Sequence, residues 1–521
     1  MALVRRLSHI SADLREAEVA LAERDPARAL ALTNGLIKAR PGDVAVLRIR
    51  QRAFAAQGDQ IGMAATLASL RRADRAAAIA DIERRLHGSL AETDARWRSR
   101  VPGPLEHLEP VNDRRVLHLL KESRPHRQSG YTVRSHYNVM SQRHGGWEPA
   151  VLTALGFPRW RTGTPGPAME EIEGVRYHRL DPGPAYPQDA PAADWIEDYT
   201  WRAADVVRKE RPAIIHASSG WRGYDAALVG LALGRHFGQP VVYEVRGVFD
   251  GPVISEGRER QRRRRADTEV RVMAEADAVV TLAETMRQEF VERGIPAEKV
   301  FVIPNGVDPE TFAPMASDPA KKARYGLAGR FVIGYISNLD QPREDFETLI
   351  AATSRLAADG RDVGCLIVGD GTRRDELETL ARRSGAADRI VFTGQVPHDE
   401  VRALYALMDA FVVPRRDERA ARLVTPLKPF EAMAMARPLI VADLPALVEI
   451  APDGVRGLSY RTESAEGLAQ AVGRLMDDPG LAERLAAAGH DWVIAERTWS
   501  ANGPRWNEAY GYVLDRRRKA G

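Results

Sequence analysis

The chain has 521 residues, 44% hydrophobic and 28% charged, a composition that supports large cores and about three domains. No apolar run approaches the 18 or so residues of a spanning helix, and the net charge of +3 gives no indication of nucleic-acid binding. The N-terminal residues carry acids soon after a short apolar stretch and lack a small-residue cleavage site, so we expect no signal peptide. The single cysteine, Cys365, cannot form an internal disulfide, and no Cys/His cluster has metal-ligand spacing. We expect a cytoplasmic protein.

Residues 1–98 are predicted to be helical, because they are rich in Ala, Leu and Arg and almost free of β-branched runs. Residues 21–25 recur loosely as residues 55–59, an offset of 34, and these helices resemble tetratricopeptide repeats. Fewer than three repeats bury too little surface to stand alone, so we expect them to pack on the catalytic body or to bind a protein partner. Residues 99–114 are predicted to be a linker.

Residues 115–308 alternate short apolar runs with helical patterns, which is typical of a parallel sheet covered on both faces. The predicted strands are 116–120, 151–155, 214–216, 241–244, 278–282 and 300–303. The proline- and glycine-rich stretch 156–191 is predicted to be an irregular surface loop.

Residues 309–497 repeat this alternation. The predicted strands are 331–336, 364–368, 390–393, 410–413, 439–442 and 458–460. Two successive doubly wound sheets predict an α/β protein with two Rossmann-like domains facing a cleft, since ligands bind at the carboxyl ends of the strands. Within 498–521, aromatic residues such as Trp499 and Trp506 have helical spacing. This helix either crosses back to the first domain or closes the second.

A basic run begins at Arg258 and ends at Arg265. A solvated helix face is the default interpretation. The more specific interpretation is a basic patch that binds anionic lipid at the inner membrane face or an acidic acceptor. It follows from the expectation that four consecutive arginines cannot all find partners.

The segment 423–443 is the most informative. Thr425-Pro426-Leu427 is predicted to form a turn, with Lys428 at the start of a helix that reaches residue 436 and leads into a buried strand. A helix N-terminus beside a lysine suits a diphosphate. Glu431, one turn further on, could accept two hydroxyl protons of a sugar. The alternative is an ordinary βα junction with a surface lysine.

This segment resembles the donor-binding motif of glycosyltransferase family 4. Residues 431–434 (Glu-Ala-Met-Ala) match its second half, whereas the first Glu of the motif falls at Leu423. The Thr-Pro-Leu-Lys-Pro turn resembles a subgroup with a lysine there. The segments VIPNGVD (302–308), IVGDG (367–371) and FTGQV (392–396) also resemble the family and follow its order.

The resemblance implies a GT-B fold and transfer of a sugar from a nucleotide-sugar donor to an acceptor. It also implies retention of anomeric configuration, by front-face attack in which the leaving phosphate takes the acceptor's proton. The chain shows no Asp-x-Asp metal signature in a suitable setting, so we expect no metal. The acceptor class stays open: glycan, lipid-linked, small-molecule or protein.

In the family, two cations hold the donor phosphates, and the matching positions here are Tyr335 and Glu344. Lys428, Arg415 and Arg416 are the candidates to replace them. By resemblance, Glu431 would bind the ribose. The residues predicted to bind the donor are Gly130, Asn338, Val396, Arg415, Arg416, Leu427, Lys428 and Glu431.

The predicted catalytic residues are His216, Ser218, Arg246 and Lys428. His216 and Ser218 end a strand that resembles a His-x-His motif, with Ser218 in place of the second His. Arg246 either binds a substrate oxygen or pairs with Glu244. His136 is predicted to be a histidine on a helix surface.

Two alternatives remain open from the sequence. A sugar-nucleotide epimerase or phosphorylase could share the fold. A catalytically degenerate helical-repeat scaffold would explain the family residues that are replaced at Leu423, Ser218, Tyr335 and Glu344. The presence of Lys428 and Glu431 favours an enzyme.

Overall fold

The computed structural model describes residues 2–75, 78–248 and 255–520. The chain forms two compact units. The first contains the described residues of Met1–Lys121, Ala150–Val241 and Phe249–Ala276, and the second those of Glu122–Pro149, Val242–Val248 and Asp277–Gly521. In the described ranges, no helix is both long and apolar enough to cross a membrane.

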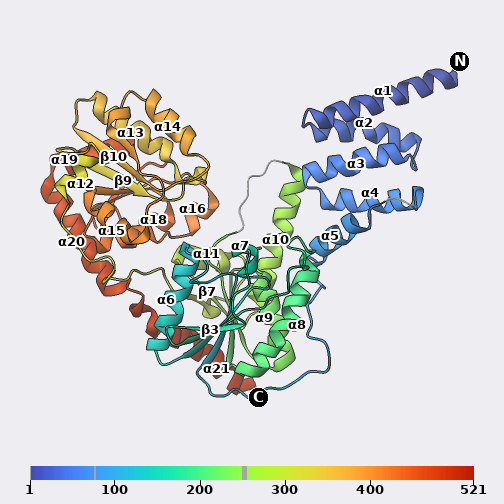
Figure 1. Ribbon diagram of the computed structural model, residues 1–521, viewed down its shortest axis with the longest axis horizontal. Helices are drawn as coiled ribbons and strands as arrows, with labels where there is room; N and C mark the ends of the chain where they lie inside the picture. The colour runs from blue at the N-terminus through green and yellow to red at the C-terminus, as the bar shows by residue number, and fades with distance from the viewer. Residues whose placement is uncertain (1, 76–77, 249–254, 521) are drawn as a thin grey trace. The chain divides into compact units, whose positions relative to one another are not determined.

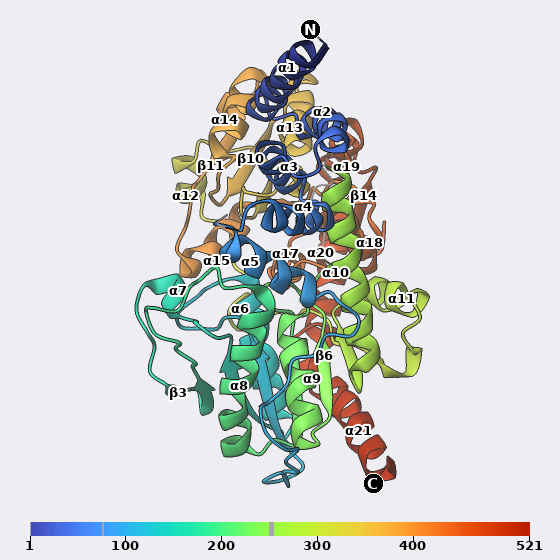
Figure 2. The ribbon, with the colours of Figure 1, turned by 90° about the vertical axis from the view of Figure 1, so that its right-hand side faces the viewer.

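The N-terminal helical region, the described part of residues 2–98, contains α1 (Ala2–Ala22), α2 (Pro26–Ala39), α3 (Val44–Gln57), α4 (Gln60–Ala73) and α5 (Ala80–Ala91). Figures 1 and 2 show these helices stacked in chain order. The carboxylates of Asp25, Asp43 and Asp59 accept backbone N–H bonds at the starts of α2, α3 and α4. The offset of 34 in the sequence corresponds to α2 and α4, which both have 14 residues and begin after a capping aspartate.

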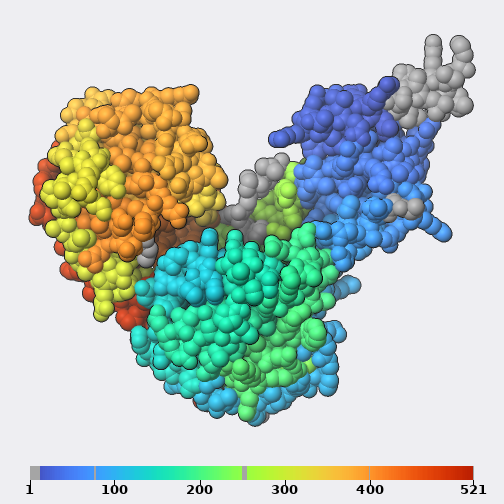
Figure 3. Space-filling model, in the orientation of Figure 1, coloured from blue at the N-terminus to red at the C-terminus, as the bar shows by residue number. Residues whose placement is uncertain are grey.

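The helical region packs on the body of the first unit. Arg98 Nη2 lies 2.6 Å from Glu275 Oε1 on α10 (Glu256–Glu275). Ser99 Oγ, just beyond the helices, donates to Thr200 Oγ1 over 2.8 Å. In the space-filling view of Figure 3 the helical region, in blue, is a closely packed group.

The arginine run of α10 is largely paired. Of residues 262–265, the first two bond to Glu259, one turn earlier, at 2.7 and 2.8 Å. Arg264 donates to Gln60 of α4, and the charge of Arg265 acts on buried Glu92. The expectation that four consecutive arginines cannot all find partners is therefore wrong, and less free positive charge remains on this helix than the sequence predicts.

The first sheet has the strand order β3-β4-β2-β1-β5-β6-β7-β8. Its strands are β1 (Arg115–Leu120), β2 (Glu148–Thr153), β3 (Met169–Ile172), β4 (Val175–His178), β5 (Ile214–Ser218), β6 (Val241–Glu244), β7 (Ala278–Thr281) and β8 (Val300–Val302). β1 pairs in parallel with β5, with Val116 opposite Ile214 and His118 opposite His216. β6, β7 and β8 are also parallel. All of β5 to β7 is buried, as the apolar runs predict.

The predicted loop at 156–191 contains an antiparallel pair, so the loop expectation is wrong in part. Strand β3 pairs with β4, Met169 opposite His178, and β4 continues the sheet by pairing in parallel with β2. These strands have only four residues each, and the sequence of β3, MEEI, lacks an apolar run. Pairing of β4 with β2 and of β3 with β4 holds these strands in the sheet, and a local sequence pattern does not reveal such contacts.

The second sheet has the order β11-β10-β9-β12-β13-β14, and all its pairs are parallel. Its strands are β9 (Phe331–Ile336), β10 (Val363–Val368), β11 (Ile390–Phe392), β12 (Ala410–Val413), β13 (Leu439–Ala442) and β14 (Gly457–Tyr460). Cys365 is buried within β10. The predicted strands of both sheets agree with the observed ends to within three residues.

Helices cover the sheets. Those of the first unit are α7 (Arg159–Thr162), α8 (Ala192–Glu210), α9 (Asp225–Phe237) and α10. Those of the second unit are α6 (Gly130–His144), α11 (Glu284–Glu292), α12 (Pro319–Arg324), α13 (Phe346–Ala358), α14 (Arg374–Arg383), α15 (His398–Leu407), α16 (Arg419–Leu423), α17 (Lys428–Ala434), α18 (Pro445–Ile450), α19 (Ala465–Asp477), α20 (Pro479–Glu496) and α21 (Gly503–Ala520). Short 3₁₀ turns are η1 (Ala297–Lys299), η2 (Pro342–Glu344), η3 (Ala387–Arg389) and η4 (Ser500–Asn502).

The C-terminal helix α21 packs against α6, β7 and β8 in the second unit. The Trp147 indole N–H donates to Asn507 Oδ1 over 2.7 Å, and its ring lies 4.8 Å from that of Tyr510. Just before α21, Trp499 stacks on Tyr137 of α6 with ring centroids 5.2 Å apart. Aromatic side chains at helical spacing thus join the end of the chain to α6.

Candidate functional site

A basic cavity of about 470 Å³ lies within the second unit. Its walls come from segments that follow β6, β7, β8, β9 and β12, together with the starts of α6 and α17. Doubly wound sheets bind ligands at this carboxyl edge. The lining residues are Gly130, Tyr131, Arg134, Arg246, Leu282, Asn305, Ser337, Asn338, Gln341, Arg343, Glu344, Arg415, Val424, Thr425, Pro426, Leu427 and Lys428. Five of these are cationic and one is acidic, which suits an anionic ligand.

Lys428 begins α17, after Leu427 and before Pro429, which fits the first turn of a helix. Burial lowers the pKa of Lys428; the charges of Glu344 and Glu431 oppose this shift, while those of Arg415 and Arg343 add to it. Because the net direction is downward, the protein alone leaves this cation poorly compensated. An anionic ligand would supply the missing charge.

Glu344 lies in the wall of the cavity, 5% exposed, between two partners. Arg415 Nη2 lies 3.3 Å from Glu344 Oε1, and the Tyr335 hydroxyl donates to Oε2. Burial raises the pKa of Glu344, but the charges of Arg415 and Lys428 outweigh this effect and leave the pKa below its usual value. The two residues at the family's cation positions, Tyr335 and Glu344, thus form a buried group that holds Arg415, two residues after the end of β12.

Arg343, directly before Glu344, adds a further cation to the cavity. Its side chain is about two-fifths exposed, and its Nε lies 3.6 Å from Glu344 Oε1. This guanidinium is therefore accessible to a ligand, unlike that of Arg415.

Gly130, a predicted donor-binding residue, is the first residue of α6. Ser129 caps the helix, its side chain accepting the Thr132 N–H while the Thr132 hydroxyl accepts the Ser129 N–H. A Cβ at Gly130 would lie 3.4 Å from Leu427 Cδ1, so a larger side chain would enter the cavity beside Leu427. Absence of a side chain here keeps the space between α6 and the turn before α17 open.

Glu244, buried at the end of β6, gathers polar groups from α6. Arg134 Nε and Asn138 Nδ2 donate to its Oε1 over 2.9 and 3.0 Å, while Arg246 donates to Oε2 over 2.8 Å from Nε. Arg246 also donates to Ser135 Oγ over 2.5 Å. The structure thus shows the predicted pairing of Arg246 with Glu244 and, at the same time, places Arg246 in the cavity lining.

Glu431 lies one turn into α17 and accepts a hydrogen bond from the Tyr405 hydroxyl over 2.6 Å. It is not among the lining residues, although its charge reaches Lys428. The burial of Tyr405, followed by the Glu431 charge, raises the pKa of that tyrosine, which keeps it a neutral donor.

The other predicted donor residues lie in different places. Asn338, exposed after β9, lines the cavity and accepts the Asp340 N–H over 2.6 Å. Arg416 does not line it; its Nη2 donates to Glu347 Oε1 over 2.8 Å. Val396 packs against the core of the second sheet.

His216 and Ser218 are buried in β5 of the first unit, and neither belongs to the basic cavity. The ring of His216 lies 4.5 Å from that of His118 on β1. His136 is 7% exposed on α6, so the expectation of a surface histidine is wrong. Its ring packs 5.3 Å from Tyr137, since this side of α6 faces the interior.

Sequence reasoning did not single out Arg134, Arg343 or Tyr131. A signal for Arg134 existed, because it lies four residues after Gly130 and so on the same helix face. Arg343 directly precedes Glu344, which stands at a family cation position. Asn305 belongs to the VIPNGVD segment; its Nδ2 donates to the Thr425 carbonyl over 2.8 Å.

Two family models match the chain. Residues 129–306 match "Glycosyl transferase 4-like domain", and residues 330–478 match "Glycosyl transferases group 1". Every lining residue of the basic cavity falls within these two ranges.

Curated relatives carry transferase names. The GDP-mannose-dependent alpha-(1-6)-phosphatidylinositol monomannoside mannosyltransferase of Mycolicibacterium smegmatis is 31% identical over 48% of this chain and 65% of its own length. The chain therefore spans slightly less than two thirds of that relative. The alpha-D-kanosaminyltransferase of Streptomyces kanamyceticus is 29% identical over 57% of this chain and 76% of its own.

Solved structures share the fold. The sucrose-phosphate synthase of Thermosynechococcus elongatus superposes with a TM-score of 0.63 at 21% identity, over 77% of this chain and all of its own. HepE of Anabaena, solved with UDP and glucose, gives 0.60 at 18% over 76% of this chain and 99% of its own. The two matching models and the two curated relatives are all described as transferases, and none of these four descriptions is of an epimerase, a phosphorylase or a scaffold. Residues 129–306 and 330–478 therefore match glycosyltransferase models, and the chain carries them on the two Rossmann-like sheets of a GT-B fold.

Proposed function

We propose that the protein transfers a sugar from a nucleoside diphosphate sugar to an acceptor, and that the basic cavity holds the diphosphate. One observation carries the proposal. Residues predicted from separate parts of the sequence line this single basic cavity: Gly130, Arg246, Asn338, Arg415, Leu427 and Lys428. Fixed cations suit two adjacent phosphate groups.

In this proposal, Lys428 and Arg343 bind the leaving diphosphate and stabilise its negative charge. As the bond between the sugar and the diphosphate breaks, negative charge grows on the diphosphate oxygen, and preorganised cations stabilise that charge more than the ground state. Lys428 suits this role because it stands at the start of α17 and lines the basic cavity. No divalent metal is required. Transfer retains the anomeric configuration, with the leaving phosphate accepting the proton of the attacking hydroxyl.

Glu431 binds the ribose hydroxyls in this proposal. Its second carboxylate oxygen is held by Tyr405, which fixes the orientation of the group. Since a ribose contact is nearly the same before and during reaction, Glu431 contributes to donor affinity more than to turnover.

The names of one relative and one structural neighbour indicate which donor bases and sugars to test first. One relative is named as GDP-mannose-dependent, and one structural neighbour was solved with UDP and glucose. Both nucleotides are therefore the first to test. We assign residues 115–308 to the acceptor side and 309–497 to the donor side, place the reaction in the cytoplasm, and leave residues 1–98 available to a protein partner.

Calorimetric titration of the whole chain with GDP and with UDP, in excess chelator, tests the proposal. We expect one of them to bind, and at 100 times its dissociation constant to stabilise the fold by about 2.7 kcal/mol. Absence of binding by both would overturn the proposal, and binding only after magnesium or manganese is added would overturn its metal-free part. Incubation with GDP-mannose or UDP-glucose alone, followed by analysis of the sugar, separates transfer from epimerisation.

A further inference from the structure

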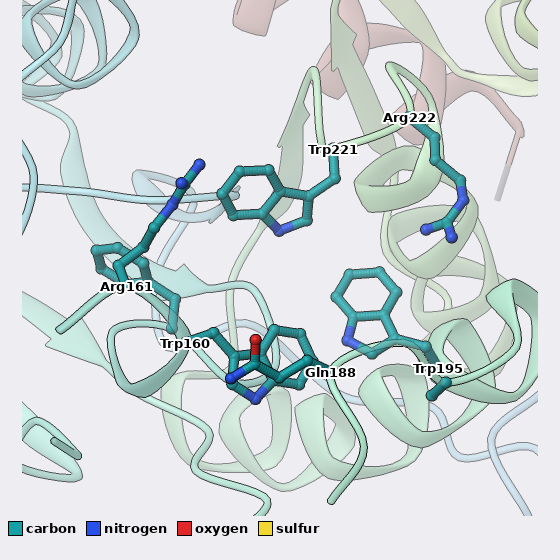
Figure 4. Close-up of a pocket in the computed structure, with 8 residues that line it drawn as sticks. Trp160, Arg161, Gln188, Trp195, Trp221 and Arg222 are labelled. Atoms are coloured by element: carbon teal, nitrogen blue, oxygen red, sulfur yellow. The ribbon is translucent and has the colours of Figure 1, made fainter. Parts of the chain in front are cut away.

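An aromatic pocket of about 260 Å³ lies in the first unit and shares no lining residue with the basic cavity. Its side chains include Trp160, Trp195, Trp221, Arg161, Arg222 and Gln188. Figure 4 shows the three indole rings arranged around the hollow, with the two arginines on either side of Trp221 and Gln188 beside Trp160. The proposed donor chemistry uses none of them.

The inner walls of this pocket are rigid. Gly156 has φ +90°, and a Cβ there would lie 2.4 Å from the Trp160 ring, so this glycine lets the indole pack on the backbone. Trp195 on α8 is 5% exposed, and its N–H donates to the Leu155 carbonyl over 3.4 Å. A ligand would meet two indoles that are already in place.

The outer wall is an aromatic face beside cations. Trp221, in the turn after β5, is 37% exposed, although large apolar side chains are usually covered. Its backbone N–H donates to Asp225 Oδ2 over 3.0 Å, which fixes the turn. The Arg161 guanidinium carbon lies 5.0 Å from the centroid of the Trp221 ring, and Lys121 Nζ lies 5.4 Å from it.

Arg222 is held in position by the N-terminal helical region. Its Nε lies 3.3 Å from Oε2 of Glu92, a fully buried residue that directly follows α5. The described lining contains two arginines and no acid. Glu92 offsets the charge of Arg222 in part, so the positive character of the pocket comes mainly from Arg161.

These features suit an anionic sugar. A pyranose ring presents a face of C–H bonds that packs on an indole, and its hydroxyls bond to arginine and glutamine. A phosphate or carboxylate on the ring would face Arg161. A volume of about 260 Å³ is small for a ligand pocket, so it fits one sugar unit better than a lipid chain or a peptide.

We propose that the aromatic pocket binds an anionic saccharide unit, a single pyranose that carries a phosphate or a carboxylate, and that this unit belongs to the acceptor. The acceptor role rests on the proposed function. Trp160 and Trp221 provide the stacking faces, and Arg161 provides the charge that selects anionic over neutral sugars.

Tryptophan fluorescence of the whole chain tests this proposal directly, because three of its nine tryptophans line the pocket. The probes are glucose 6-phosphate and glucuronate, with methyl glucoside and inorganic phosphate as controls. We expect a saturable change with at least one anionic sugar, at a dissociation constant roughly tenfold below those of both controls. The two anionic probes distinguish phosphate from carboxylate.

Two variants with exposed side chains and a matched control locate the binding. Trp221→Ala should lower the affinity for the anionic sugar about threefold to tenfold. Arg161→Gln should reduce its affinity to that of methyl glucoside. Trp201→Ala, which removes a tryptophan that is 56% exposed on α8 and outside the pocket lining, should leave affinity unchanged.

Titration with GDP and UDP separates this proposal from the proposed function. If a nucleotide binds but neither anionic sugar does, or if sugar affinity is the same in wild type, Trp221→Ala and Arg161→Gln, the saccharide pocket is refuted and the donor assignment stands. If the sugar binds in the expected pattern but neither nucleotide binds, the pocket is supported and its acceptor role is refuted.

Discussion

Replacement of Lys428 by methionine should separate stability from function. Methionine keeps most of the apolar length of lysine and removes the charge. Because burial depresses the pKa of Lys428, the folded state disfavours its cation, and Lys428→Met should raise the melting temperature at pH 7. The folded pKa lies below the unfolded one, so this gain should shrink as pH rises through the ordinary lysine value of about 10.4.

The same substitution should weaken binding of the nucleotide. A charge-assisted hydrogen bond contributes about 1.5 to 3 kcal/mol, so affinity for the nucleoside diphosphate that binds wild type should fall roughly 10- to 150-fold. Turnover at saturating donor should fall further, since the charge on the diphosphate grows as the glycosidic bond breaks. Calorimetry measures affinity, and nucleotide release at saturating donor measures turnover.

Lys322 provides a matched control. Its Nζ lies 2.9 Å from Asp409 Oδ2, away from the basic cavity, so Lys322→Met removes an ion-paired lysine. This variant should melt at a lower temperature and bind nucleotide as wild type does. If Lys428→Met instead keeps wild-type affinity and turnover in a folded protein, Lys428 does not hold the diphosphate.

Glu431→Gln should weaken donor affinity at least tenfold while turnover at saturating donor stays near wild type; the opposite pattern in calorimetry and kinetics would exclude a ribose contact. Burial raises the pKa of Glu92 from 4.5 to about 7, so wild type should lose stability as pH rises between these values, and Glu92→Gln should flatten that slope in melts at pH 5 and 8. An identical slope would contradict the burial argument. A chain that begins at Pro104 should melt at a lower temperature yet keep its nucleotide affinity, because the removed part contains no residue of the basic cavity; weaker binding by a folded truncated protein would refute this division.

Most strands were predictable because a strand buried on both faces appears in the sequence as a run of apolar residues. Cys365 and its neighbours in β10 form an apolar run buried on both faces, and such runs recur at βα spacing. Strands β3 and β4 leave no such trace, since MEEI and VRYH mix charged and apolar residues. Their position depends on the edge that β2 offers.

The site was predictable only where chemistry is local. Lys428 and Gly130 stand beside turns and helix starts that the sequence marks with proline, serine and glycine. Arg343 and Arg134 reach the basic cavity through the tertiary fold, and no local pattern distinguishes them from the many surface arginines of this chain. Arg416 shows the converse: it follows the same strand as Arg415 but pairs with Glu347.

The arginine run on α10 shows why charge counts mislead. Its residues appear as an unpaired cluster in the sequence because their partners are either one turn away or on α4. Ion pairs on a helix depend on spacing of three or four residues, which composition does not capture.

The contacts of Arg134 join segments that lie far apart in the sequence and are therefore synthesised at different times. Its guanidinium meets Glu244 and Asn305, which follow it by 110 and 171 residues, and Asn305 in turn meets Thr425, another 120 residues on. Loop closures of this length are slow and come after the local helices. During synthesis, the wall of the basic cavity therefore cannot close until the chain has been made beyond Thr425. Nucleotide binding would then report that the chain has been made past Lys428, because a shorter nascent chain lacks part of the wall.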